Sequence, residues 1–254
     1  MNDMEQATTF LTMANSVKGV TQADYRRIMP CVEAVKSFAR TTHKSIYIID
    51  FYKRNFLYVS ESPTLLCGLK ASVMQKMGYD FFRTHVPEEE QPMLDSLNQA
   101  VYEVIYSVPA EHRCECMLSF NFHLRHDDRL ILVNHKSTPM ALTKDGAIWL
   151  VMATVSISPH KTSGHIEFFQ FYMRERLEYS LETGRWNNRT TIELRPEEQQ
   201  VLILSAQGYT MKEISEQMLR SFDTVKFYRR QIFRKLGVQS VAEALTFATN
   251  YGLI

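Results

Sequence analysis

The sequence has no excess of charge of either sign, since 29 Lys and Arg residues face 28 Asp and Glu residues and the net charge is +1. Such a chain carries no overall sign of binding to nucleic acid or to membranes. Long apolar runs are also missing: the longest covers residues 147–153, whereas a membrane-spanning helix needs about 20 apolar residues. Residues 1–13 lack the basic region followed by an apolar run that marks a secretory signal. With only four cysteines, we expect a soluble, cytoplasmic protein with reduced thiols and no membrane partner.

The chain contains enough apolar residues for a packed core, and its charges are unevenly distributed along the sequence. The chain has 254 residues, of which 45% are hydrophobic, so it suits one or two domains of roughly 100–200 residues each and is not a disordered chain. Between Arg220 and Lys235, six basic residues face Asp223 as the single acidic one. We therefore expect the function to involve this segment.

Residues 45–157 have the pattern of an α+β domain. Two short apolar runs, 46–49 and 56–59, predict a β-hairpin. A helix is predicted after Pro87 and Pro92, because apolar residues recur at three- and four-residue spacing at Leu94, Leu97, Val101 and Val104. Three further strands are predicted at 114–124, 130–138 and 147–157, with turns at 127–128 and 144–146. Together these elements predict an antiparallel five-stranded sheet with helices.

Two segments flank this predicted domain. Residues 1–44 are expected to form a helical arm, with helices near 6–17 and 30–41 and a helix-start signal at Thr21 and Asp24. Residues 158–190 are expected to connect two domains, because they contain prolines, glycines and the pair Asn187-Asn188. They also carry several aromatic residues, so we expect a small hairpin or helix that packs on one neighbour.

Residues 191–254 carry the clearest local signals. Thr210 with Glu213 and Ser240 with Glu243 match the capping box of a helix start, and Ser221 precedes another helical run. The signals predict four short helices at about 196–206, 211–218, 222–236 and 241–250, with a helix-turn-helix between the second and third. On a helical wheel, Val225, Ile232 and Leu236 form the buried stripe of the third helix. The opposite face carries Asp223, Lys226, Phe227, Arg230 and Arg234. This face either enters a major groove of DNA or is simply a solvated charged face, and geometry alone leaves both open.

Eighteen residues of this segment carry a family resemblance: Leu194, Pro196, Glu198, Val201, Leu202, Gly208, Lys212, Glu213, Ile214, Ser221, Thr224, Val225, Lys226, Ile232, Lys235, Leu236, Gly237 and Val238. In this order and without a gap, residues 192–250 resemble the LuxR/GerE-type helix-turn-helix signature. The resemblance implies an all-α, four-helix domain that binds double-stranded DNA. It places base-reading positions on Lys226, Phe227 and Arg230, and phosphate-side positions on Thr210, Lys212, Ser221, Thr224, Tyr228, Arg229 and Arg234. The sequence departs from the family pattern at Arg195, Arg220 and Tyr228, and Arg195 is expected to weaken one helix cap.

Residues 45–156 resemble a PAS domain, both in the order of their predicted elements and at Asp50, Val59, Leu66, Gly68 and the run His85 to Glu89. The resemblance implies a sensor that holds a small molecule between sheet and helices or binds a protein partner. No flavin-type Asn-Cys-Arg motif surrounds Cys67, and residues 91–107 contain no histidine that could bind haem. No cofactor is therefore expected.

A metal site is the main alternative in the first half of the chain. His112, Cys114, Cys116, His123 and His126 form a ligand set on paper. Strand alternation instead places Cys114 and Cys116 on the apolar face and His123 on the opposite one, so we expect core cysteines and no metal. His135, on an aliphatic strand, is expected to be a hydrogen-bonded histidine.

The sequence thus predicts a transcriptional regulator with a PAS-like sensor and a LuxR-type DNA-binding domain, which acts as a homodimer on two half-sites. No nucleophile elbow, phosphate-binding loop or dinucleotide motif is found, so we expect no enzymatic activity. One alternative is a regulator that uses the helix-turn-helix to bind another protein. The other is a metalloprotein that uses the Cys/His strand.

Overall fold

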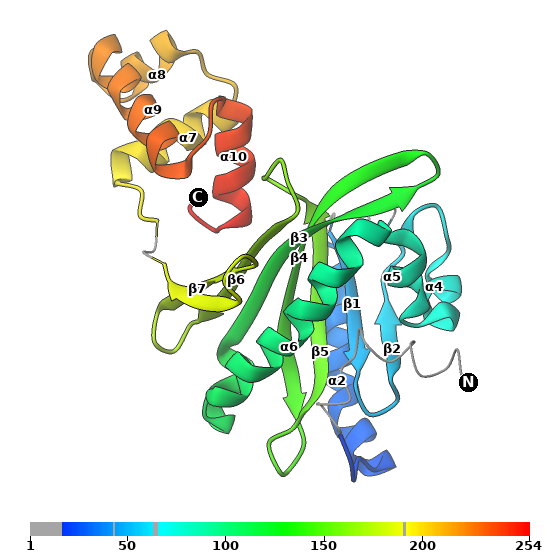
Figure 1. Cartoon of the computed structure of the whole chain (residues 1–254). Helices are drawn as coiled ribbons and strands as arrows, with labels where there is room; N and C mark the ends of the chain where they lie inside the picture. The colour runs from blue at the N-terminus through cyan, green and yellow to red at the C-terminus, as the bar shows by residue number, and fades with distance from the viewer. Residues whose placement is uncertain (1–16, 43, 63–65, 190–191) are drawn as a thin grey trace. The chain divides into compact units, whose positions relative to one another are not determined.

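The computed structural model describes residues 17–42, 44–62, 66–189 and 192–254. The chain divides into two compact units at residue 189, which we call the N-terminal domain and the C-terminal domain (Figure 1). The predicted helix near 6–17 lies almost wholly outside the described residues. Within the described ranges, no helix is both long and apolar enough to cross a membrane.

The N-terminal domain is built on one antiparallel sheet of eight strands, in the order β2-β1-β5-β4-β3-β6-β7-β8. Its strands are β1 Ser45–Asp50, β2 Asn55–Val59, β3 Cys116–His126, β4 Arg129–Leu142, β5 Ile148–Ile157, β6 Gly164–Gln170, β7 Glu175–Ser180 and β8 Arg185–Asn188. The predicted hairpin and the three predicted strands after it correspond to β1 to β5. The α+β class is confirmed, with a large antiparallel sheet followed by a helical domain.

The prediction of five strands is wrong, because the segment expected to connect two domains adds β6, β7 and β8 to the same sheet. Strand β6 pairs with β3 and brings Ile166 and Phe168 into the interior, where both are almost fully buried. Without β6, the backbone of β3 would present an open edge. Ile166 and Phe168 of this segment are therefore core residues of a continuing sheet, whereas Phe171 is 57% exposed.

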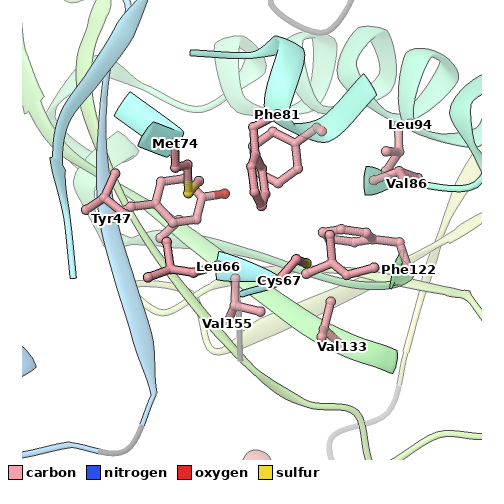
Figure 2. Packing of buried hydrophobic residues seen from close by; sticks show 14 of the residues in the cluster. Tyr47, Leu66, Cys67, Met74, Phe81, Val86, Leu94, Phe122, Val133 and Val155 are labelled. Atoms are coloured by element: carbon pink, nitrogen blue, oxygen red, sulfur yellow. The ribbon is translucent and has the colours of Figure 1, made fainter. Parts of the chain in front are cut away.

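Helices cover both faces of the sheet (Figure 1). On one face lie α4 Ala71–Met77, α5 Asp80–His85 and α6 Gln91–Ser107, with short 3-10 turns at Glu88–Glu90 and Ala110–Glu115. On the other face, α2 Gln22–Ala39 packs Tyr25 and Val32 against Ile48, Trp149 and Leu150. The main core lies between the sheet and the first group of helices, where Tyr47, Met74, Phe81 and Phe122 point toward one interior (Figure 2).

Two local predictions in this domain need correction. The helix expected to begin at Pro30 instead starts at Gln22, capped by Thr21 and Asp24, and runs through Pro30. Packing of Tyr25 and Val32 on either side of the proline offsets the one hydrogen bond that it removes. Cys114 does not lie on a strand: it is exposed in the 3-10 turn before β3, so only Cys116 joins the apolar face.

The C-terminal domain contains α7 Pro196–Ala206, α8 Met211–Gln217, α9 Phe222–Leu236 and α10 Val241–Asn250, as predicted to within about a residue. The predicted buried stripe of α9 is confirmed, since Val225, Ile232 and Leu236 are at most 5% exposed. They pack with residues of the other three helices in one small core.

Candidate nucleic-acid interface and internal cavity

The helix-turn-helix is held by caps at both of its helices. At α8, the Thr210 hydroxyl accepts from the Glu213 amide at 3.4 Å, and the Glu213 carboxylate accepts from the Thr210 amide at 2.7 Å. The Thr210 amide and hydroxyl both donate to this carboxylate and thereby lower the pKa of Glu213. At α9, the Ser221 hydroxyl accepts from the Thr224 amide at 3.2 Å. Both helix starts are thereby fixed without using the basic residues nearby.

An ion pair between Lys235 and Glu198 joins α9 to α7. The Lys235 ammonium lies 2.7 Å from Glu198 Oε2 and also donates to the Glu193 carbonyl at 3.0 Å. Glu198 is 2% exposed and accepts a further hydrogen bond from the Arg195 amide at 2.8 Å. Glu198 therefore supplies half of a capping box even though the Arg195 side chain caps nothing. Lys235 is partly buried, with 29% of its side chain exposed, and its charge is paired with that of Glu198.

The predicted outward face of α9 is solvent-exposed along its whole length: Asp223, Lys226, Phe227, Arg230 and Arg234 are all exposed. Arg234 donates to Gln231 at 2.5 Å, one turn back on the same helix. Within the described part of the chain, Lys226 and Arg230 have neither an ion pair nor a side-chain hydrogen bond. They stand one turn apart on the same face, which leaves two cations free for an external partner.

The other predicted contact residues divide into two groups. Thr210, Lys212 and Ser221 are exposed at the starts of α8 and α9. Thr224, Tyr228 and Arg229 are partly buried. Tyr228 packs against the core of the domain, and the Arg229 guanidinium lies 5.8 Å from the centre of the Phe233 ring. The second group is therefore less available to a ligand than the first.

The N-terminal domain encloses a cavity of about 140 Å³ between its sheet and α6. The lining is mainly apolar and aromatic: Tyr47, Ile49, Phe51, Tyr79, Phe82, Leu94, Leu97, Asn98, Val101, Tyr102, Ile105, Tyr106, Leu118, Phe120, Phe122, His135, Ser137, Pro139, Ile148, Val151 and Phe168. An engineered apolar cavity of roughly 150 Å³ is large enough for benzene. The space therefore suits a molecule of about that size.

Two polar atoms in the cavity wall lack a hydrogen-bond partner in the described structure, the Tyr79 hydroxyl and His135 Nδ1. The other ring nitrogen of His135, Nε2, lies 2.5 Å from the Tyr47 hydroxyl. Burial lowers the pKa of His135 to about 3, so its ring is neutral near pH 7. His135 is thus hydrogen-bonded, as the sequence predicted, and it lies in the cavity wall. Its Nδ1 atom has no hydrogen-bond partner in the described structure. Sequence reasoning missed Tyr79 because nothing local connects it to His135.

The Cys/His set that suggested a metal site is divided among separate partners. Cys116 is fully buried, and its thiol points to the His112 carbonyl at 3.6 Å. Burial raises the pKa of this thiol to about 11. His123 lies 2.6 Å from a Glu90 carboxylate oxygen. Among the described residues, no three His, Cys, Asp or Glu side chains are placed to share a metal ion.

The last strand before the C-terminal domain is attached to the helix that lines the cavity. Trp186 of β8 donates its indole N–H to the Ala100 carbonyl of α6 at 3.3 Å. Its ring also lies 6.0 Å from Phe168, which lines the cavity, and 5.0 Å from Tyr179. Trp186 therefore connects the end of the N-terminal domain to the cavity wall.

Residues 193–248 match the family model of the bacterial regulatory proteins of the luxR family, a family of regulators and not of enzymes. Comparison with curated proteins gives no match. Among solved structures, the chain is similar to the Vibrio cholerae VqmA dimer, with 19% identity, a TM-score of 0.31, and coverage of 87% of this chain and 88% of that chain.

A phage VqmA-DPO complex shows 14% identity and a TM-score of 0.32, over 89% of this chain and 91% of that chain. The N-terminal domain of a diguanylate cyclase with PAS/PAC sensor from Marinobacter aquaeolei shows 11% identity and a TM-score of 0.32, over 45% of this chain and 94% of that chain. At these values the likenesses do not extend the family assignment beyond residues 193–248.

Proposed function

We propose that this chain, whose C-terminal domain is a helix-turn-helix domain of the LuxR family, is a sequence-specific DNA-binding transcriptional regulator controlled by a PAS-like N-terminal sensor. One observation carries the proposal: α9 presents Lys226 and Arg230 on an exposed face, free of internal partners in the described chain. Lys235, a nearby basic residue of the same helix, is instead paired with the buried Glu198 carboxylate.

In this proposal α9 lies in the major groove. Lys226 and Arg230, one turn apart, donate to the acceptor edges of guanine. Thr210, Lys212, Ser221 and Arg234 contact phosphates on either side, where they set the position of the helix without reading sequence. Thr224, Tyr228 and Arg229 are the remaining predicted contact residues. Because they are partly buried, we expect them to contribute less to the binding free energy than the exposed residues do.

Phe227 has a separate role in the proposed interface. It is 44% exposed on the reading face and has no polar atom to offer to a base. An aromatic side chain there fits against the methyl group of thymine. We expect the preferred site to contain a thymine beside the positions read by Lys226 and Arg230.

The proposed regulator works in the cytoplasm as a homodimer. A dimer is expected because one recognition helix covers only one half-site, and two half-sites lie about one DNA turn apart. Residues 45–157 form the proposed PAS-like sensor, 1–44 an arm, 158–190 the connection and 191–254 the DNA-binding domain. This connecting segment comprises strands β6 to β8 at one edge of the sheet. The proposed sensor takes a small, mainly apolar molecule into the cavity, or responds to a protein partner.

Trp186 supports a route from the cavity to the DNA-binding domain. A ligand in the cavity touches α6 and Phe168, and both contact Trp186. The strand that carries Trp186 ends at Asn188, directly before the C-terminal domain. We propose that ligand binding shifts this strand and thereby changes the geometry of the dimer on DNA.

The DNA-binding part is tested by selecting bound duplexes from random sequence with the purified full chain. We expect one enriched motif, an affinity that falls steeply with salt, and a loss of about 2–4 kcal/mol of binding free energy in the Lys226→Ala, Arg230→Ala double variant. Phe227→Ala should bind but tolerate other bases at the thymine position. If no motif is enriched while the domain captures another regulator, the protein-binding alternative is correct.

The sensor part is tested with two probe molecules, phenol and benzene, that differ by one hydroxyl group. Phenol should bind more tightly, because its hydroxyl can pair with Tyr79 or His135. Tyr79→Phe removes one unpartnered hydroxyl, so it should preserve folding and reduce the preference for phenol. If neither probe binds to the full chain by ligand-observed NMR, the cavity is not a binding site.

A further inference from the structure

All four helices of the C-terminal domain end in the same way. An amide donates back to the carbonyl five residues earlier: Tyr209 to Leu204 at 3.2 Å, Arg220 to Ser215 at 3.0 Å, Val238 to Phe233 at 3.1 Å and Leu253 to Ala248 at 2.8 Å. This is the hydrogen bond of the Schellman motif, which requires a left-handed residue one position before the donor. Those residues are Gly208, Leu219, Gly237 and Gly252, with φ of 89°, 52°, 67° and 62°. Three of the four are glycine and one is leucine.

The leucine is unfavourable for folding in two ways. Its Cβ is crowded in the left-handed conformation, whereas glycine adopts it freely. Its side chain is 89% exposed, so no packing within the domain offsets this strain. The neighbouring Met218 is the residue that packs into the core. The fold therefore accounts for the conformation at position 219 but not for the choice of leucine there.

The following position shows the same departure. After two of the glycines, Val238 and Leu253 turn into the core of the domain, as is usual for this motif. After Leu219 the residue is Arg220, which is exposed. At the end of α8, then, the apolar residue faces solvent and a cation stands beside it.

Leu219 does not stand alone on this surface. It lies in the turn of the helix-turn-helix, two residues before the cap Ser221, and Phe222 begins α9 with half of its side chain exposed. Lys226 follows Phe222 by one turn on the same flank of α9. Two exposed apolar residues, three positions apart, thus stand close in sequence to the exposed cations Arg220 and Lys226. Such a segment suits a polyanion with apolar surface between its charges.

We propose that Leu219 and Phe222 make an apolar contact with duplex DNA at the edge of the major groove, beside the bases read by α9. Deoxyribose carbons and thymine methyl groups are the apolar surfaces that duplex DNA presents next to its phosphates. Strain kept at an exposed position is typical of a functional contact. The inference rests on the proposed DNA binding and adds two contact residues to it.

Replacing Leu219 should change the stability of the domain and its affinity for DNA in opposite directions. Leu219→Gly relieves the left-handed strain, so amide exchange in residues 192–254 of the full chain should become slower. The same change removes the apolar contact, so affinity for the selected duplex should fall by about fivefold. Leu219→Asn, which also tolerates this conformation, should lose the same affinity, and Phe222→Ala should weaken binding as well.

Equal or tighter DNA binding by Leu219→Gly would overturn the proposal and leave this surface to a protein partner. That result differs from failure of the proposed function, in which the unsubstituted chain itself selects no duplex. Gly208→Ala is the matched control, because it adds strain at an equivalent helix end whose added Cβ meets no other atom within 4 Å. It should speed amide exchange in the domain and leave the affinity of the folded protein for the duplex unchanged.

Discussion

The two domains differ in how completely their buried polar groups are paired. In the described C-terminal domain, the buried Glu198 is paired with Lys235, and no buried side-chain nitrogen or oxygen lacks a hydrogen-bond partner. In the N-terminal domain, several buried polar atoms have no partner in the described chain, and two of them, the Tyr79 hydroxyl and His135 Nδ1, lie in the cavity wall. A fully paired interior suits a domain that presents a fixed surface, whereas unpaired atoms in a cavity wall suit one that receives a ligand.

The largest expected effect comes from breaking the one pair that joins α7 to α9. Lys235→Met removes the cation and leaves the Glu198 carboxylate buried without it, which should destabilise the C-terminal domain by about 3 kcal/mol. Amide exchange in residues 192–254 should accelerate. Both tryptophans, Trp149 and Trp186, lie in the N-terminal domain, so tryptophan fluorescence should show its unfolding unchanged.

A second substitution separates loss of the pair from loss of packing. Glu198→Gln with Lys235→Met removes both charges and keeps a group that can accept from the Arg195 amide. The double variant should recover much of the lost stability, because no uncompensated charge remains. If the double variant is as unstable as Lys235→Met, the ion pair is not what fixes α9.

Between pH 6.5 and pH 5, an intermediate effect is expected in the N-terminal domain. His135 keeps its neutral ring in the folded state down to a pKa of about 3, whereas in the unfolded chain it takes up a proton near pH 6.5. Below pH 6.5 the unfolded state therefore binds the extra proton, and stability falls with pH by up to about 1.4 kcal/mol per unit. His135 alone should make the stability measured by urea unfolding, followed by tryptophan fluorescence, about 1.6 kcal/mol lower at pH 5 than at pH 6.5.

The C-terminal domain is the built-in control, because residues 191–254 contain no histidine. After correction for intrinsic rates, its amide exchange should indicate the same stability at both pH values. His135→Gln keeps a group that can bond to Tyr47 but cannot be protonated, so it should reduce the pH dependence of the N-terminal domain. The remaining slope belongs to His160, whose pKa burial lowers to about 4. A slope that is unchanged in this variant would show that His135 is not the group responsible.

The same contrast explains what the sequence could predict. The helices of the C-terminal domain begin at local signals, such as Ser240 with Glu243, and the outward position of Lys226 follows from helical periodicity alone. In the N-terminal domain the deciding contacts are distant in sequence: β1 lies between β2 and β5, and Tyr79 shares a cavity with His135. Strand alternation predicted the burial of Cys116, but no local pattern indicated that Trp186 bonds to Ala100. No local pattern indicated the 3-10 turn before β3 either, and this turn places Cys114 outside the strand.

The smallest expected effect concerns the contact between β8 and α6. Trp186→Phe keeps an aromatic ring but removes the N–H that donates to the Ala100 carbonyl, which should cost the N-terminal domain about 1 kcal/mol. Because the extra hydrogen bond lies on α6, amide exchange should accelerate in the second half of that helix and in β8, while residues 192–254 keep their exchange rates. Trp149→Phe is the matched control, since Trp149 packs against Tyr25 on the opposite face of the sheet. If both variants change α6 equally, or neither does, Trp186 does not link the cavity wall to the chain that leads into the C-terminal domain.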